Sequence, residues 1–180
     1  MERKAFAHIE AWNNKKNRKP LVLMGARQVG KTWLMESFAR KVYADDFVAV
    51  NFMEDDAMRN SFETANLDPK TLLSLIQVRS NRKIVPGRTL ILLDEIQESP
   101  RALTSLKFFN EKMPDLAIVA AGSLLGFSLR RKRGSKKKID RGSFPVGKVD
   151  FLDIRPMTFA EYLMARGESA KLDELRAGNW

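Results

Sequence analysis

The sequence predicts a three-layer α/β sandwich built around a parallel sheet of five strands. Short apolar runs of the kind that form buried strands alternate with segments of helical character. That alternation is typical of parallel strands joined by right-handed helical crossovers. The first predicted strand leads into a glycine-rich loop and the third ends in two acidic residues, so both polar sites follow strands. The five strands are Leu21–Met24, Phe47–Phe52, Leu90–Leu93, Leu116–Ala121 and Val149–Ile154.

Helices are predicted in the gaps between these strands, and several of their starts carry recognisable signals. A capping side chain before a proline marks two helices, and a capping box marks a third. Apolar residues at near-helical spacing predict a fourth helix over residues 3–13. The residues concerned are Asp68-Pro69, Ser99-Pro100, Thr158 with Glu161 (a helix through Leu163), and Phe6, Ile9 and Trp12.

Length and composition fit one ordinary globular domain with a substantial core. The chain has 180 residues, of which 44% are hydrophobic and 30% charged. It has no cysteine, which excludes disulfides and thiolate metal sites and is compatible with the reducing cytoplasm, where we expect the protein to lie. The longest apolar runs are far shorter than the roughly 20 residues of a membrane span, and the N-terminus lacks an apolar export signal, so no membrane association is expected.

The net charge of +10 is concentrated in one segment, residues 130–141. This segment holds eight basic side chains against one acid, Asp140, a net of +7. Such a run can grip a nucleic-acid backbone or form a solvated loop, and the sequence leaves both readings open. No aromatic residue interleaves it, so base stacking is not indicated. The basic residues are Arg130, Arg131, Lys132, Arg133, Lys136, Lys137, Lys138 and Arg141.

The glycine-rich loop has the spacing G-x-x-x-x-G-K-[ST], read as Gly25-Ala26-Arg27-Gln28-Val29-Gly30-Lys31-Thr32. The glycines let successive backbone amides face one concavity at a helix N-terminus, where they can cradle phosphate. Lys31 would supply charge to the β- and γ-phosphates of ATP, and the Thr32 hydroxyl would be a magnesium ligand. Trp33 follows directly and is a candidate nucleotide contact. A strand before the loop and a helical apolar face after it provide the context that this motif requires.

The acidic pair Asp94-Glu95 ends the third predicted strand. In open α/β sheets ligands bind at the carboxyl ends of the strands, so both carboxylates are expected beside the glycine-rich loop. Asp94 would hold magnesium, and Glu95 would orient and deprotonate the attacking water. Two solvated acids in a turn are the simpler alternative for this pair taken alone.

Together these motifs resemble the AAA+ superfamily of ATPases, and more narrowly a group of prokaryotic ATPases that carry a C-terminal, nuclease-like domain of unknown function. The resemblance spans nearly the whole chain. It rests on the loop and on five other strings, which are Lys19-Pro20-Leu21, Leu92-Leu93-Asp94-Glu95-Ile96-Gln97, Gly122-Ser123, Phe144-Pro145-Val146-Gly147-Lys148 and Pro156-Met157-Thr158-Phe159-Ala160-Glu161-Tyr162.

The resemblance implies a P-loop sheet of strand order 5-1-4-3-2, with Ser123 at the position whose polar side chain contacts the γ-phosphate or the attacking water. The alternative for Ser123 is a cap on a helix over Leu124–Leu129. Members of the group continue into a helical lid and the nuclease-like domain, whereas this chain stops at Trp180. We therefore expect an ATPase core over residues 1–163, a linker or truncated lid over 164–180, and slow hydrolysis by this chain alone.

The resemblance also implies an arginine finger and a homo-oligomer of the full-length protein. Arg130, Arg131 and Arg141 are candidates for the finger, and the sequence does not choose among them. The leading hypothesis is Mg²⁺-dependent ATP hydrolysis. The alternatives are a regulatory or nucleic-acid-binding module that binds ATP with little turnover, and a small-molecule kinase, which lacks a supporting lid or acceptor motif. GTP is disfavoured because no Asn-Lys-x-Asp string is present.

Overall fold

Parallel strands form one five-stranded sheet at the centre of the molecule, in the order β2-β3-β4-β1-β5. The computed structural model describes residues 3–123, 145 and 147–177. The predicted fold class and strand order are confirmed. The strands are β1 (Leu21–Met24), β2 (Phe47–Asn51), β3 (Leu90–Asp94), β4 (Ala117–Gly122) and β5 (Asp150–Asp153).

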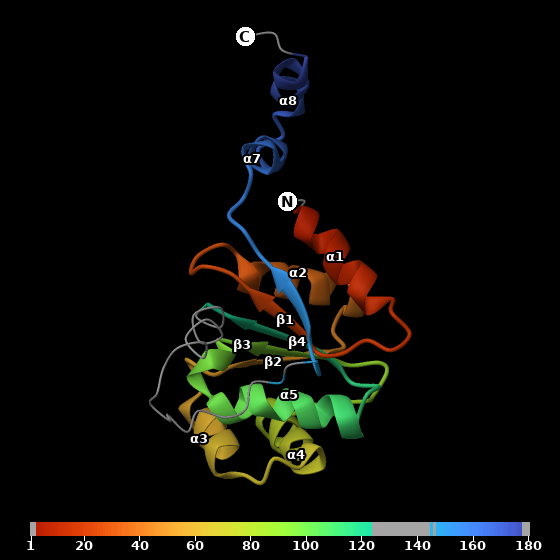
Figure 1. Ribbon diagram of the computed structural model, residues 1–180, viewed down its shortest axis with the longest axis vertical. Coiled ribbons are helices and arrows are strands. Elements are labelled where there is room, and N and C mark those ends of the chain that lie inside the picture. The colour runs from red at the N-terminus through yellow and green to blue at the C-terminus, as the bar shows by residue number, and fades with distance from the viewer. Residues whose placement is uncertain (1–2, 124–144, 146, 178–180) are drawn as a thin grey trace.

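Helices cover both faces of the sheet (Figure 1). On one face lie α1 (Lys4–Asn13) and α2 (Lys31–Tyr43). On the other lie α3 (Asp56–Thr64), α4 (Pro69–Ser80) and α5 (Pro100–Lys112), and a short 3₁₀ helix, η1 (Ile96–Glu98), follows β3. The last two helices, α7 (Phe159–Ala165) and α8 (Ser169–Arg176), project away from the sheet beyond the N-terminal end of α1 (Figure 1).

The central strand β3 shows why the sheet needs helices on both sides. Successive side chains of a strand point to opposite faces. Ile91 and Leu93 belong to the apolar cluster beneath α3, α4 and α5, whereas Leu90 and Leu92 belong to the cluster beneath α1 and α2. All four are fully buried, so a continuous apolar run rather than an alternating one forms this strand.

The predicted helix starts are confirmed by their caps. Asp68 and Ser99 each accept a hydrogen bond from the amide three residues ahead, with a proline in the first turn. Thr158 and Glu161 form both bonds of the capping box, and the helix that follows runs to Ala165, two residues beyond the predicted end.

Strand ends differ from the prediction by about one residue. The fourth strand begins at Ala117 because the Leu116 amide donates to the Met113 carbonyl at 3.1 Å, closing the turn after α5. The second strand ends at Asn51 and the fifth spans Asp150–Asp153, so both are shorter than predicted. Within the residues described, no helix combines the length and apolar character needed to cross a membrane.

Ser99→Ala is expected to destabilise the fold by about 1–2 kcal/mol, because it removes an N-cap and a buried hydrogen bond together. The fully buried Ser99 hydroxyl donates to a Glu63 carboxylate oxygen at 2.6 Å and accepts from the Ala102 amide at 3.2 Å. Urea unfolding measures the change. Ser74→Ala, the same substitution at an exposed position within α4, is the control and should be close to neutral. Equal effects at both positions would contradict this role of Ser99.

Candidate nucleotide site

The loop between β1 and α2 is shaped by a close approach to β5. A Cβ atom on Gly25 would lie 2.2 Å from the Ile154 carbonyl oxygen, so this position excludes every other residue type. Gly30 at the other end of the loop has φ = 85°, a left-handed conformation that glycine adopts without a steric penalty. Glycine is therefore required at the two positions for different reasons. At position 25 the cause is a close contact with another chain segment, and at position 30 it is the backbone conformation.

Lys31 begins α2 and folds back over this loop. Its ammonium donates to the carbonyl oxygens of Gly25 at 3.1 Å and Ala26 at 2.6 Å. Burial lowers the pKa of Lys31, while the nearby carboxylates of Glu95 and Asp94 oppose that shift. The ammonium thus sits where charge is poorly solvated and only partly compensated, which favours its interaction with an incoming anion.

The loop and the acidic strand end meet through a short hydrogen bond. The Thr32 hydroxyl donates to one carboxylate oxygen of Asp94 at 2.6 Å, and the Glu95 amide donates to the other at 2.9 Å. Burial raises the pKa of Asp94, partly offset by the bond from Thr32. A hydroxyl beside a partly buried carboxylate is an all-oxygen donor pair that fits Mg²⁺, which binds one or two protein oxygens and keeps its remaining positions for water and phosphate.

Glu95 follows in a left-handed backbone conformation, with φ = 48° and ψ = 42°. Non-glycine residues are uncommon there, and such strain gathers at functional sites. The Gln97 side-chain amide donates a hydrogen bond to a Glu95 carboxylate oxygen. The string containing Gln97 was recognised in the sequence, but nothing in its spacing assigned this side chain to the carboxylate, because the contact depends on the turn at Glu95.

Ser123 directly follows β4, the strand that lies between β1 and β3 in the sheet. The register pairs Met24 with Gly122, so Ser123 comes at the edge of the sheet where the loop and the acidic pair begin. Its hydroxyl oxygen is buried and has no hydrogen-bond partner among the described residues. Its contact with phosphate or water stays a prediction. The alternative helix over Leu124–Leu129 lies outside the described residues.

A cavity of about 480 Å³ opens between α1, α2 and α7. Trp33, 40% exposed, lines it together with Arg3, Phe6, Lys41 and Met164. The sequence singled out Trp33 but not its neighbours from α1 and α7, since helical spacing alone gave no sign that these helices meet. Of the other predicted loop residues, Arg27 and Gln28 are exposed and Val29 is buried.

The candidate arginine fingers Arg130, Arg131 and Arg141, and the basic segment 130–141 as a whole, lie outside the described residues. Trp12 and His8, both in α1, have contacts within the fold that do not involve the candidate site. Trp12 is buried and donates to the Lys19 carbonyl at 2.7 Å, and the exposed His8 pairs with the Lys4 carbonyl of its own helix.

The sheet order, with β4 inserted between the loop strand and the acidic strand, is that of a P-loop protein. A family model described as an AAA domain matches residues 17–163, and the chain belongs to that family. Among proteins with curated descriptions, none matches the sequence.

Solved structures agree on the fold. The Walker-type ATPase PABY2304 of Pyrococcus abyssi superposes with a TM-score of 0.54 at 15% identity, over 94% of this chain and 58% of that one. The ORC1 protein of Aeropyrum pernix, solved in complex with DNA, gives a TM-score of 0.52 at 16% identity, over 92% of this chain and 48% of that one. The chain thus spans about half the length of these structures.

Gly25→Ala is expected to destabilise the protein by about 1–3 kcal/mol more than Gly87→Ala, because its methyl group would overlap the Ile154 carbonyl. Gly87 is the matched control, since it also has positive φ, 79°, but open space around its Cβ position. Chemical unfolding of the two variants measures the difference. If Gly25→Ala costs no more than Gly87→Ala, the loop is not held against β5 in this way.

Proposed function

We propose that this chain binds ATP with Mg²⁺ and hydrolyses it. The hydrogen bond between Thr32 and Asp94 carries the proposal, because it brings together, 2.6 Å apart, two oxygen atoms of the kind that bind Mg²⁺, at the end of the glycine-rich loop. Family membership supports nucleotide binding by this fold. We place the activity in the cytoplasm, in keeping with a chain that has no cysteine.

In this proposal each residue acts on a different part of the substrate. The amides of residues 26–31 hold the phosphate oxygens, and Lys31 leaves its two carbonyl acceptors to contact the β- and γ-phosphates. Bound magnesium would neutralise charge that develops on the phosphates, held by Thr32 and by Asp94. Glu95 orients the attacking water and accepts its proton. The Ser123 hydroxyl donates a hydrogen bond to the γ-phosphate or to that water.

The cavity at Trp33 is suited to the nucleoside part of ATP. Its lining includes Trp33, the residue after Thr32 in the sequence, and Trp33 and Phe6 bring aromatic surface to it, while Lys41 and Glu10 bring an ion pair. We propose that Trp33 contacts the nucleotide there. An arginine from a neighbouring copy of the chain, with Arg130, Arg131 and Arg141 as candidates, would complete the site in an oligomer.

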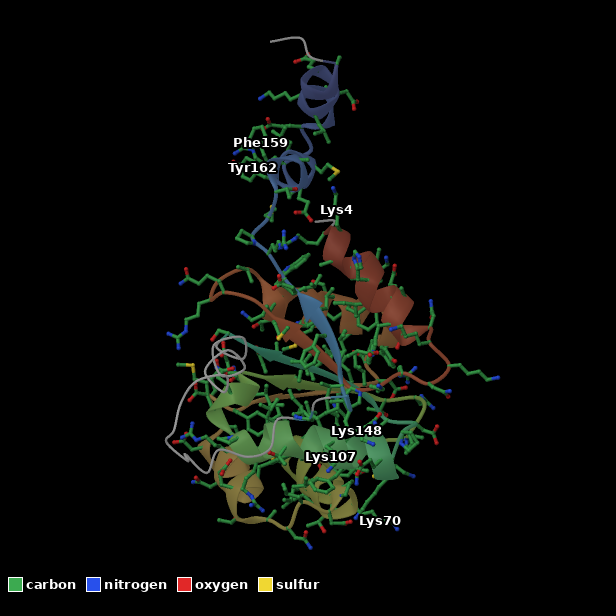
Figure 2. The ribbon with its side chains drawn as sticks, viewed as in Figure 1. Lys4, Lys70, Lys107, Lys148, Phe159 and Tyr162 are labelled. Atoms are coloured by element: carbon green, nitrogen blue, oxygen red, sulfur yellow. The ribbon has the colours of Figure 1, made fainter. Side chains whose placement is uncertain are left out.

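Lys31→Ala is expected to abolish ATP binding, whereas Glu95→Gln should keep binding and lower turnover by about 10²–10⁴-fold, the usual contribution of a general base. The difference arises because Lys31 acts on the bound phosphates and Glu95 only on the water. Calorimetry with Mg-ATP and a phosphate-release assay measure the two effects. Lys70→Ala, on the opposite helical layer (Figure 2), is the control and should change neither. If Lys31→Ala and Glu95→Gln bind ATP equally well, the role of Lys31 is wrong.

The basic segment supports a second candidate function, ATP-regulated nucleic-acid binding with little hydrolysis. Its net charge of +7 over residues 130–141 is the observation that favours it. If the segment neutralises phosphates of duplex DNA, log affinity falls against log salt by about 0.9 per phosphate. Replacing Lys136, Lys137 and Lys138 together by alanine should make that slope shallower by about two to three. An unchanged slope would assign the segment to a solvated loop.

A further inference from the structure

Arg3 is a buried arginine that joins three separate parts of the chain. It stands just before α1, and its side chain is only 5% exposed. One terminal nitrogen donates to the carbonyl of Val29 in the phosphate loop at 3.1 Å, and the other donates to the carbonyl of Arg155, after β5, at 2.7 Å. Its Nε lies 3.4 Å from a carboxylate oxygen of Glu161 in α7. Arg3 also lines the cavity at Trp33, but it has no assigned part in the chemistry of the proposed reaction.

Glu161 is equally buried, and its two oxygens are separately occupied. One accepts from the Lys4 amide at 2.9 Å, and the other accepts from the amide of Thr158 at 2.8 Å. Burial pushes the pKa of Glu161 up, but these bonds and the Arg3 charge outweigh it, so the pKa lies below its usual value and the group is ionised at neutral pH. Figure 2 shows Lys4 near the base of the projecting helix that carries Phe159 and Tyr162.

The contact with Val29 constrains the geometry of the loop itself. In a planar trans peptide the N–H points opposite to the C=O of the same peptide unit. The Val29 carbonyl accepts a hydrogen bond from Arg3, so the Gly30 N–H of the same peptide unit points away from Arg3. It is thereby turned to the opposite side of the peptide, as an amide that binds phosphate must be. A Cβ atom on Gly30 would lie 3.5 Å from the same Arg3 nitrogen, which confirms how closely the guanidinium is applied to the loop.

We propose that Arg3 is a positioning residue that fixes the Val29–Gly30 peptide for phosphate binding and transmits the state of the loop to α7 through Glu161. The inference rests on the proposed binding of ATP. The planar guanidinium donates to two carbonyls from its two terminal nitrogens, while its charge faces the Glu161 carboxylate without a hydrogen bond from Nε. A lysine ammonium on a flexible stem cannot do so with the same geometry. Phosphate binding that orders the loop should therefore also stabilise the contact between Arg3 and Glu161, which holds α7. By linkage, stabilising that contact should favour phosphate binding.

The experiment compares hydrogen exchange and ATP affinity in the wild type, Arg3→Met, Arg3→Lys, Glu161→Gln and the control Arg40→Met. Arg40 forms an exposed ion pair on α2 and touches neither the loop nor α7. In the wild type and the control, Mg-ATP should slow amide exchange in residues 158–165. Arg3→Met should lower ATP affinity at least tenfold, and at saturating Mg-ATP its exchange in 158–165 should not change.

The other two variants separate positioning from mere anchoring. Glu161→Gln leaves the contact between Arg3 and Val29 in place, so ATP affinity should fall by less than about threefold while the ATP-dependent slowing in 158–165 is lost. Arg3→Lys keeps the charge without the fork and should bind ATP more weakly than the wild type, which provides the test if Arg3→Met does not fold. A residue that only anchored α7 would change exchange in 158–165 equally with and without ATP and leave affinity unaltered.

The outcomes distinguish this inference from the proposed function. A wild-type chain that does not bind Mg-ATP overturns the proposed function, and the positioning role is then decided without nucleotide, where Arg3→Met should speed exchange in residues 25–32 and Arg40→Met should not. Unchanged exchange there, or wild-type ATP affinity in both Arg3 variants, overturns the positioning role. ATP-dependent slowing in 158–165 that survives Arg3→Met overturns the transmission to α7.

Discussion

The position of β4 between β1 and β3 is the constraint on which the rest of the site depends. Because all strands are parallel, the ends of β1, β4 and β3 reach the same edge of the sheet, each followed by a polar feature. The phosphate loop follows β1, Ser123 follows β4 and Glu95 follows β3. A sheet with β1 beside β3 would bring the loop and the carboxylates together without Ser123 between them. The order of strands, more than any single contact, thus sets which groups face a bound phosphate.

The charges of Lys31 and Asp94 at this edge of the sheet favour the binding of both an anion and a cation. Burial shifts the pKa of Lys31 down and that of Asp94 up, so the charged form of each is disfavoured, and their mutual attraction only partly restores it. In the proposed complex, triphosphate would supply negative charge to the lysine and a divalent cation would supply positive charge to the carboxylate, so the two ligands would relieve both deficits together. Binding either partner alone would leave one of the two charges poorly compensated.

Much of the fold and of the candidate site could be predicted from the sequence. The remaining features could not be, for definite physical reasons. Local signals suffice where the determinant is local, as for the helix that starts at Ser99 and for Gly30, which a left-handed backbone conformation requires. Gly25 is required by the approach of Ile154, a contact between distant segments that the sequence does not show. The strand order came from resemblance, because alternating apolar runs specify parallel pairing but not which strand lies next to which. The bond from Gln97 to Glu95 was out of reach since it depends on a left-handed turn at a glutamate, which no propensity indicates.

The ion pair of Arg3 and Glu161 is the clearest case of a determinant invisible in sequence, since its partners are 158 residues apart and neither is part of a recognised catalytic motif. A buried pair of this kind adds little net stability compared with apolar residues of the same size, because desolvation offsets the attraction, whereas loss of one partner costs about 3–5 kcal/mol. Stability alone therefore does not explain an arginine at this position. Apolar side chains could fill the space but could not donate to the carbonyls of Val29 and Arg155, and the Val29 carbonyl would then lose its buried hydrogen bond. The charged pair differs from an apolar contact because the hydrogen bonds of the guanidinium fix the orientation of the carbonyl groups that accept them. Apolar packing does not fix that orientation.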